Sequence, residues 1–187
     1  MKLLILSGNP KTDGLCQLVI DAAAAGAEDG GADVNVVRLC DMEIGRCHVC
    51  EEGWGVCRNE DYCLFGDDGF DEVATQVLAA DAVVLATPVY WHESSEALKS
   101  FIDRFRRCYF GAGGPFAGKQ VLLIASAGGT GNGLLPCLQQ LERFCQHTGA
   151  EVFDMIGVNR WNNDYKREAA YAAAKAIVEG RRNGDTL

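Results

Sequence analysis

The hydrophobic and polar positions of the chain follow two alternating patterns. Five short segments are predominantly apolar and are predicted to be strands: residues 2–6, 34–39, 82–86, 121–125 and 151–158. Residues 82–86 form a continuous apolar run with β-branched residues, which is typical of a strand buried on both faces of a parallel sheet. Apolar residues recur at helical spacing over residues 15–29, 69–79, 98–107, 134–147 and 166–179. Strands and helices therefore alternate, which predicts a parallel sheet covered by helices on both faces.

This alternation has a preferred topology at a length of 187 residues. It predicts an α/β, doubly wound, three-layer sandwich with five parallel strands in the order 2-1-3-4-5. In that order, the loops after the first and third strands flank the point where the strand order reverses, and open sheets bind their ligands there. We expect residues 1–187 to form one domain, because this length is enough for one well-buried core.

Residues 41–68 interrupt the pattern as a cysteine-rich insertion. The segment has no convincing periodicity, and irregular connections of this length are usually functional. Residues 41–72 hold ten acidic and two basic side chains, a net charge of -8 within a chain whose total is -9. This charge argues against nucleic-acid or anionic-lipid partners, which require clustered lysine and arginine.

The first residues and the longest uncharged stretch of the sequence indicate where in the cell the protein is expected. The first apolar run is four residues long, too short for a signal peptide, so we expect a cytoplasmic protein. Residues 120–141 carry no charge, but glycines and Pro136 break the stretch, so we expect no membrane span. In a reducing compartment, clustered cysteines more often bind metal or carry out redox chemistry than form disulfides.

The loop after the first strand has the composition of a phosphate-binding turn. It reads Ser7-Gly-Asn-Pro-Lys-Thr-Asp-Gly14 and precedes a helix, so its amides and the helix N-terminus would point at one place, and Lys11 could add a charge. The alternative is an ordinary turn in which Thr12 or Asp13 caps the helix.

Two further loops follow strands three and four. In Thr87-Pro-Val-Tyr-Trp91, Pro88 keeps Thr87 out of the helical region, so we expect the chain to leave the sheet there in an ordered turn with two aromatic side chains. The alternative is a plain loop whose aromatics pack into the core. The small residues 126–133 form a backbone that can lie flat against a planar ligand.

Together these motifs resemble the NADPH-dependent FMN reductase and iron-sulfur flavoprotein group of flavodoxin-like proteins. The motifs are Ser7-Gly-Asn-Pro-Lys11, Ala82-Val-Val-Leu-Ala-Thr-Pro-Val-Tyr-Trp91, Leu98-Lys-Ser-Phe-Ile-Asp-Arg104 and Gly118-Lys-Gln-Val-Leu-Leu-Ile-Ala-Ser-Ala-Gly-Gly129. The resemblance covers most of the chain. It implies a flavodoxin-like fold, FMN as bound cofactor, NAD(P)H as co-substrate, and a homodimer or homotetramer.

The resemblance also implies which residues bind FMN. The first loop would hold the phosphate, the second the edge of the isoalloxazine ring, and the third would lie beside the ring. These residues are Ser7, Asn9, Lys11 and Thr12; Thr87, Pro88, Val89, Tyr90 and Trp91; and Ser126, Ala127, Gly128 and Gly129.

One position departs from the family pattern in the first turn of the helix that follows the phosphate loop. Family members usually carry Asn-Thr or Asn-Ser where this chain has Leu15-Cys16, so a hydroxyl group for the phosphate is missing. A hydrogen bond to a charged group contributes about 1.5 to 3 kcal/mol. We therefore expect weaker FMN binding unless Lys11 or Thr12 compensates.

The cysteines of the insertion bear a second resemblance, to the compact cluster motif of iron-sulfur flavoproteins. The motif would comprise Cys47, Cys50, Cys57 and Cys63, with Gly53 standing where the family has its third cysteine. Four thiolates suit an iron-sulfur cluster such as 4Fe-4S, or a tetrahedral zinc, and a third interpretation is no metal at all. The remaining cysteines are interpreted as packing residues: Cys16, Cys40, Cys108, Cys137 and Cys145.

The favoured function is an FMN-dependent oxidoreductase that passes electrons from NAD(P)H through FMN to a quinone, an iron centre or another small-molecule or protein acceptor. Such chemistry belongs mainly to the cofactor and needs no acid-base pair, and none of the three histidines has a partner pattern that would make it one. The alternatives are a non-enzymatic electron carrier, and a flavin-free interaction module with a structural zinc.

The insertion also suggests an assembly. An irregular segment of this length cannot bury its own backbone cheaply, so it needs a metal or a neighbouring surface. We expect residues 41–68, with Trp54 and Trp91, to form a homo-oligomer interface that borders the flavin, because large aromatic residues are enriched in interface cores.

Overall fold

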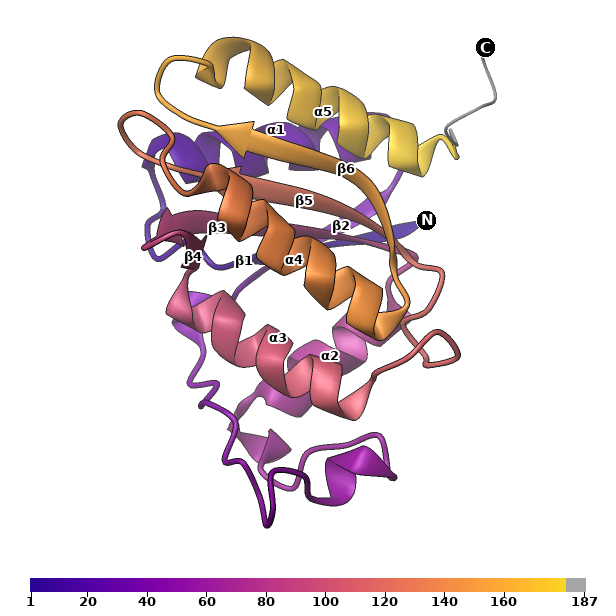
Figure 1. The fold of residues 1–187 in the computed structure, drawn as a ribbon. Helices are drawn as coiled ribbons and strands as arrows, with labels where there is room; N and C mark the ends of the chain where they lie inside the picture. The colour runs from indigo at the N-terminus through magenta and orange to yellow at the C-terminus, as the bar shows by residue number, and fades with distance from the viewer. Residues whose placement is uncertain (181–187) are drawn as a thin grey trace.

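The computed structural model describes residues 1–180 and shows strands and helices in alternation (Figure 1). The strands are β1 (Lys2–Ser7), β2 (Asp33–Arg38), β3 (Ala82–Tyr90), β4 (Glu93–Ser94), β5 (Gln120–Ser126) and β6 (Glu151–Val158). The α-helices are α1 (Gly14–Asp29), α2 (Phe70–Ala79), α3 (Glu96–Cys108), α4 (Leu134–Thr148) and α5 (Asn163–Val178). The prediction of a single domain includes residues 181–187, which lie outside the described part, and it stays a prediction.

The five long strands are parallel and lie in the order β2-β1-β3-β5-β6. This confirms the predicted order 2-1-3-4-5, with β5 and β6 as the fourth and fifth parallel strands. The sheet also has a sixth strand that the sequence did not predict, because β4 is only two residues long and pairs antiparallel with the end of β3.

The end of β3 differs from its prediction. The strand does not stop before Thr87 but continues through Pro88 to Tyr90, and Pro88 lies opposite Ser126 of β5. An extended backbone is the conformation that proline and its preceding residue prefer, so the proline prolongs the strand. The chain turns later, at Trp91 and His92, and both aromatics of the motif belong to a hairpin.

Helices cover both faces of the sheet and form three layers (Figure 1). One buried cluster joins Leu4, Leu6 and Val83 to α2, α3 and α4, and a second joins Leu3 and Ile5 to α1 and α5. Adjacent residues of a strand thus enter opposite cores, which explains the continuous apolar runs. Within residues 1–180, no helix has the length and apolar character needed to cross a membrane.

Candidate functional site

The three predicted loops meet at the carboxyl edge of the sheet. Ser7 at the end of β1 lies opposite Ala86 of β3, and Pro88 lies opposite Ser126 at the end of β5. The chain therefore brings the first, second and third loops side by side, as the order of the strands requires. The site residues implied by the resemblance accordingly share one edge of the molecule, although they come from distant parts of the sequence.

The first loop is shaped by its own side chains. The Asn9 side chain is buried, and its Nδ2 donates a hydrogen bond of 2.8 Å to the carbonyl of Lys11, whose amide donates to Asn9 Oδ1 at 3.3 Å. The amide of Asn9 in turn donates to Ser7 Oγ at 3.2 Å. Ser7 and Asn9 thus hold the loop in shape, while the side chains of Lys11 and Thr12 are exposed and free to reach a ligand.

The helix that follows this loop begins without a side-chain cap. Asp13 occupies the cap position, but among the described residues its side chain makes no capping hydrogen bond. The alternative in which Asp13 caps the helix is therefore wrong. The first turn carries no acidic side chain either. Its amides and the helix dipole are left available to an anion, which is the condition for binding a phosphate.

Two residues outside the predicted set also border the first loop. Arg38 Nη1 donates to the carbonyl of Lys11 at 3.1 Å while its Nε pairs with Asp41 at 2.8 Å. Cys40 Sγ lies 3.5 Å from the carbonyl of Gly8, and burial raises the pKa of its thiol. Sequence reasoning missed both because Arg38 ends β2 and Cys40 follows it, and only the sheet order brings that strand beside β1.

The second loop is a strained hairpin between β3 and β4. Trp91 and His92 both have positive φ, 47° and 71°, a region that non-glycine residues seldom adopt. Such strain persists only where the surroundings impose it. Here Gly133 packs so closely that a Cβ on it would lie 2.8 Å from His92 Cα.

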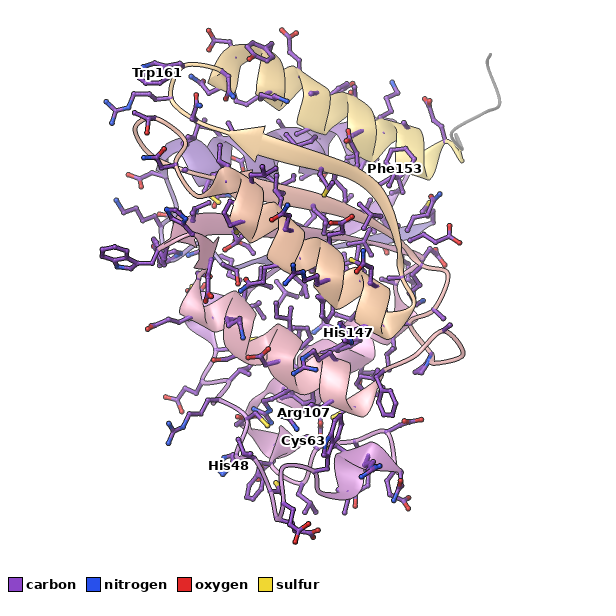
Figure 2. The ribbon with its side chains drawn as sticks, viewed as in Figure 1. His48, Cys63, Arg107, His147, Phe153 and Trp161 are labelled. Carbon is purple, nitrogen blue, oxygen red and sulfur yellow. The ribbon has the colours of Figure 1, made fainter. Side chains whose placement is uncertain are left out.

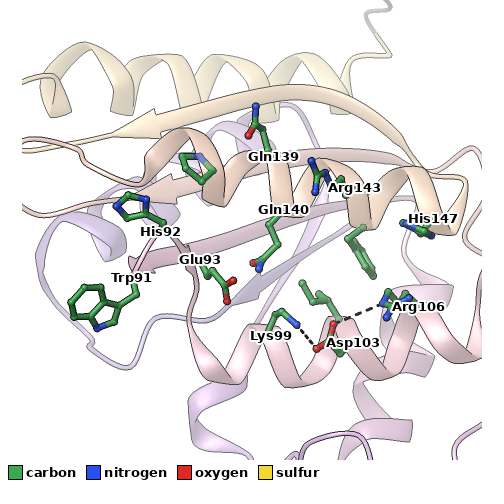
Figure 3. Close-up of a pocket in the computed structure, with 13 residues that line it drawn as sticks. Trp91, His92, Glu93, Lys99, Asp103, Arg106, Gln139, Gln140, Arg143 and His147 are labelled. Atoms are coloured by element: carbon green, nitrogen blue, oxygen red, sulfur yellow. Dashed lines mark hydrogen bonds and ion pairs between the residues drawn. The ribbon is translucent and has the colours of Figure 1, made fainter. Parts of the chain in front are cut away.

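Hydrogen bonds fix the base of this hairpin. The amide and hydroxyl of Ser94 donate to Gln140 Oε1 at 3.1 and 2.7 Å. Thr87 Oγ1 accepts from the amide of Ser95 at 2.9 Å, so its hydroxyl serves the fold. The Trp91 indole projects from the tip, 97% exposed, and Tyr90 is half exposed (Figure 3). The alternative in which these aromatics fill the core is wrong.

The third loop offers a flat backbone next to a buried hydroxyl. Ser126 and Ala127 are buried, and the Ala127 amide donates to the carbonyl of Val158 at 2.9 Å. A Cβ on Gly128 or Gly129 would meet no atom within 4 Å, so open space lies above both. Apart from the Cys16 thiol, the Ser126 hydroxyl has no hydrogen-bond partner anywhere in residues 1–180. The residues of all three loops are therefore compatible with FMN, because they provide free amides, open backbone and a buried hydroxyl that is paired only with a thiol.

A groove of about 470 Å³ runs between α3 and α4 (Figure 3). Trp91, His92 and Glu93 of the hairpin line one end of it, and none of its described lining residues comes from the first or third loop. Ile102 and Phe144 contribute apolar walls, and Arg106 of α3 and Arg143 of α4 also line the groove. Of the three arginines near the end of α3, only Arg106 reaches this groove, where its Nε lies 3.8 Å from Asp103. The sequence did not predict the groove, because it forms between side chains of two separate helices.

The cysteines of the insertion gather in a second pocket on the outer side of α3 (Figure 2). Cys47, Cys50, Cys57 and Cys63 all line it, as the sequence predicts for a shared site. Cys108 of α3 lines it too, so the interpretation of Cys108 as a packing residue only is incomplete. Burial raises the pKa of the Cys108 thiol to about 12, so it remains protonated near neutral pH.

Arg104 ties this insertion to α3. Its side chain is 1% exposed and donates from Nη1 to the Gly45 carbonyl at 3.0 Å and to Asp68 at 2.6 Å. From Nη2 it donates to the Phe65 carbonyl at 2.6 Å and to Cys63 Sγ at 3.5 Å. One guanidinium group thus bonds four residues of the insertion.

Arg107, one turn further along α3, holds the other side of the pocket. Its guanidinium lies 4.9 Å from the ring centre of Trp54 and donates to the carbonyl of Gly53. Trp54 also packs against Phe110. Trp54 is therefore engaged within its own chain, and of the two tryptophans assigned to an interface only Trp91 projects freely.

The hydrogen bonds around Asp68 lower the pKa of its carboxyl group. Burial opposes ionisation of Asp68, but the hydrogen bond from Arg104 and those from the amides of Gly45 and Phe70 outweigh it. The pKa of Asp68 consequently lies below its usual value. The Arg104–Asp68 pair is thus charged at neutral pH.

The cysteine pocket has the donors for a metal but not a closed ligand set. Within the described residues, no three Cys, His, Asp or Glu side chains converge closely enough to hold a metal ion. The chemistry of four thiols in one pocket still suits iron-sulfur or zinc, both of which prefer thiolate ligands.

Comparison with known proteins identifies the family. The sequence model of the NADPH-dependent FMN reductases matches residues 1–161. The chain belongs to this family. An iron-sulfur flavoprotein from Methanosarcina thermophila is 34% identical over 104 residues, which are 56% of this chain and 52% of that protein. This FMN reductase family member thus spans about half the length of that curated relative.

Solved structures support the fold of this family member. The NAD(P)H:quinone oxidoreductase from Methanothermobacter marburgensis superposes with a TM-score of 0.69 at 19% identity, over 96% of this chain and 95% of that one. A flavodoxin from the domain Archaea gives a TM-score of 0.63 at 14% identity, over 96% of this chain and 98% of that one. These similarities confirm the flavodoxin-like fold.

Proposed function

We propose that this protein is an FMN-dependent oxidoreductase that passes electrons from NAD(P)H to a quinone, an iron centre or another acceptor. The observation that carries the proposal is the convergence of three loops around an uncapped helix N-terminus at the carboxyl edge of the sheet, in a chain of the FMN reductase family. The predicted cytoplasmic location agrees with this role and stays a prediction.

Each loop has a separate task in this proposal. The first turn of α1 and the exposed Lys11 and Thr12 bind the phosphate through amides, a charge and a hydroxyl. Pro88, Val89 and Tyr90 border the ring, and Gly128 and Gly129 allow the backbone to approach it. FMN supplies the hydride and electron chemistry when bound. The protein positions it and, by the hairpin and the third loop, limits the access of water.

The test is flavin binding followed by reduction. We expect added FMN to lose fluorescence on titration with the protein, because the ring becomes enclosed. We expect NADH or NADPH to bleach the bound flavin in a stopped-flow instrument. Protein that leaves flavin fluorescence unchanged would refute the proposal. Bleaching by dithionite but by neither nucleotide would replace the enzyme with the electron-carrier alternative.

We further propose that the cysteine pocket holds an iron-sulfur cluster through Cys47, Cys50, Cys57 and Cys63. The four thiols line one pocket, and a relative at 34% identity is an iron-sulfur flavoprotein. The cysteine pocket is lined by Arg104, Arg107 and Cys108 from the second half of α3. Ser95, at the start of the same helix, contacts Thr87 at the base of the hairpin. At about 1.5 Å per residue, Ser95 and the pocket residues Arg104 to Cys108 are roughly 14 to 20 Å apart along the helix axis.

Replacing Cys63 with serine is expected to remove most of the iron and acid-labile sulfide from protein purified without air. The matched control is Cys40→Ser, because Cys40 contacts the first loop instead of the cysteine pocket. We expect this control to keep its metal. Zinc without sulfide would replace the cluster with the structural-zinc alternative, and wild-type protein without metal would refute both.

Assembly into a homodimer or homotetramer is a third part of the proposal. The exposed Trp91 stands at the hairpin tip, and exposed tryptophans often anchor interfaces. The acidic insertion would repel its own copy, but Arg106 and Arg143 in the neighbouring groove offer charges of the opposite sign. The flavin would then border the interface.

Light scattering at low protein concentration tests the assembly. We expect wild-type protein to be an oligomer and Trp91→Ala to shift toward monomer. Trp161→Ala is the matched control, since Trp161 is 69% exposed on the loop before α5. A monomeric mass for wild-type protein that still binds flavin would show that the second copy plays no part in the site.

A further inference from the structure

The fold does not explain the buried hydroxyl of Ser126 in the flavin site. Ser126 is 4% exposed, and apart from the Cys16 thiol its Oγ has no hydrogen-bond partner among residues 1–180. Buried hydroxyl groups are nearly always paired, so one whose only described neighbour for a hydrogen bond is a thiol calls for a ligand or another explanation. The serine ends β5 at the edge where the three loops meet.

The strand pattern shows which face this hydroxyl occupies. Leu122 and Ile124 of β5 belong to the core that α1 and α5 cover. Ser126 has the same parity, and side chains two residues apart on a strand share a face. Its hydroxyl therefore points toward α1, away from the groove between α3 and α4.

Cys16 is the neighbour that the hydroxyl meets there. It stands in the first turn of α1, 7% exposed and within the same core. Burial raises the pKa of the Cys16 thiol to about 11, and a hydrogen bond with the Ser126 side chain opposes this rise only in part. A neutral thiol is only a weak hydrogen-bond donor, so Cys16 cannot do the work of a hydroxyl group.

We propose that Ser126 donates its hydroxyl to the phosphate of FMN and so replaces the hydroxyl that α1 lacks at Cys16. Two independent observations converge on this position: the uncapped N-terminus of α1, and beside its first turn the buried Ser126 Oγ, which has no described partner except the weak Cys16 thiol. The family resemblance implies that Ser126 lies beside the isoalloxazine ring. Its side chain is on the face of the sheet that α1 covers, and this direction assigns it to the phosphate instead. This inference rests on the proposed binding of FMN.

Riboflavin separates the two assignments, because it has the same ring as FMN but no phosphate. We expect Ser126→Ala to weaken FMN binding by about ten- to a hundredfold and to leave riboflavin binding unchanged. Ser126→Cys, which keeps the volume but weakens the donor, should show the same selectivity and serves if the alanine variant does not fold. Ser100→Ala, on α3, is the matched control and should change neither affinity.

A substitution at Cys16 provides the reverse experiment. We expect Cys16→Ser to tighten FMN binding without affecting riboflavin, and to restore most of the affinity lost in Ser126→Ala. An equal loss of both ligands in Ser126→Ala would assign the hydroxyl to the ring and overturn the proposal. So would unchanged FMN affinity. Wild-type protein that binds neither FMN nor riboflavin would refute the proposed function itself. This result is obtained without the variants, so it is distinct from a failure of the Ser126 proposal.

Discussion

Replacement of Arg104 by alanine is expected to lower the free energy of unfolding by about 3 to 5 kcal/mol. The substitution removes the only described ion-pair partner of Asp68 and leaves the carbonyls of Gly45 and Phe65 without their donor. It also removes a guanidinium group that lies 4.3 Å from the ring centre of Phe70. Urea denaturation at neutral pH measures the loss.

The matched control for this change is Arg106→Ala on the same helix. Arg106 is 36% exposed and lies 3.8 Å from Asp103, a geometry worth little in solvent. We expect its substitution to cost less than about 0.5 kcal/mol. If the two variants lose similar amounts, Arg104 does not anchor the insertion.

The pH dependence of the free energy of unfolding is a second measurement that tests the role of Arg104. The pKa of Asp68 is lowered in the folded protein, so its contribution is complete above its unfolded pKa of about 3.9 and is lost as the pH falls through the folded value. The difference in stability between wild type and Arg104→Ala should therefore narrow below about pH 4. A difference that stays constant would show that packing rather than charge dominates.

The substitution should also release the insertion locally. Residues 41–68 contain little regular secondary structure, and Arg104 donates hydrogen bonds to four residues of this segment. We expect trypsin to cleave Arg104→Ala faster after Arg46 and Arg58 than it cleaves Arg106→Ala, because a detached segment opens more often.

Replacement of Gly8 by alanine is expected to damage both the fold and the flavin site. A Cβ at this position would lie 2.4 Å from Ser95 Oγ and 2.9 Å from Leu98 Cβ. Ser95 caps α3 through a bond from the Leu98 amide, so the clash would displace the cap. Overpacking and a lost cap together cost about 2 to 4 kcal/mol.

The effect on binding should exceed that of a purely structural change. The Gly8 amide bonds to the carbonyl of Ala86, which joins the first loop to β3, and a shift there moves the phosphate loop relative to the hairpin. We expect FMN affinity to fall at least about tenfold, in line with the loss of one charged hydrogen bond.

Gly113→Ala is the control, because a Cβ on Gly113 meets no atom within 4 Å. We expect this variant to match wild type in both measurements. Calorimetry for stability and flavin fluorescence for affinity decide the outcome. A stable Gly8→Ala protein with normal FMN affinity would show that the loop adjusts to the extra methyl group.

The sequence by itself determined the fold and predicted which loops would meet at one edge of the sheet. Apolar runs and helical spacing are local signals, and they predicted the parallel strands, the five helices and their order. The loops at Ser7, Thr87 and Ser126 were predicted to converge because parallel strands end at one edge. The shared pocket of four cysteines followed from their spacing within one segment.

Only the tertiary structure decided how individual side chains are used. Arg104 anchors the insertion, Cys108 joins the cysteine pocket, and Ser126 faces Cys16, which lies 110 positions earlier in the chain. Each of these depends on contacts between elements far apart in sequence. The strained hairpin at Trp91 likewise depends on Gly133 and Gln140 of another element. Periodicity reports which face of an element is buried, but the partner it meets there is set by how the layers pack.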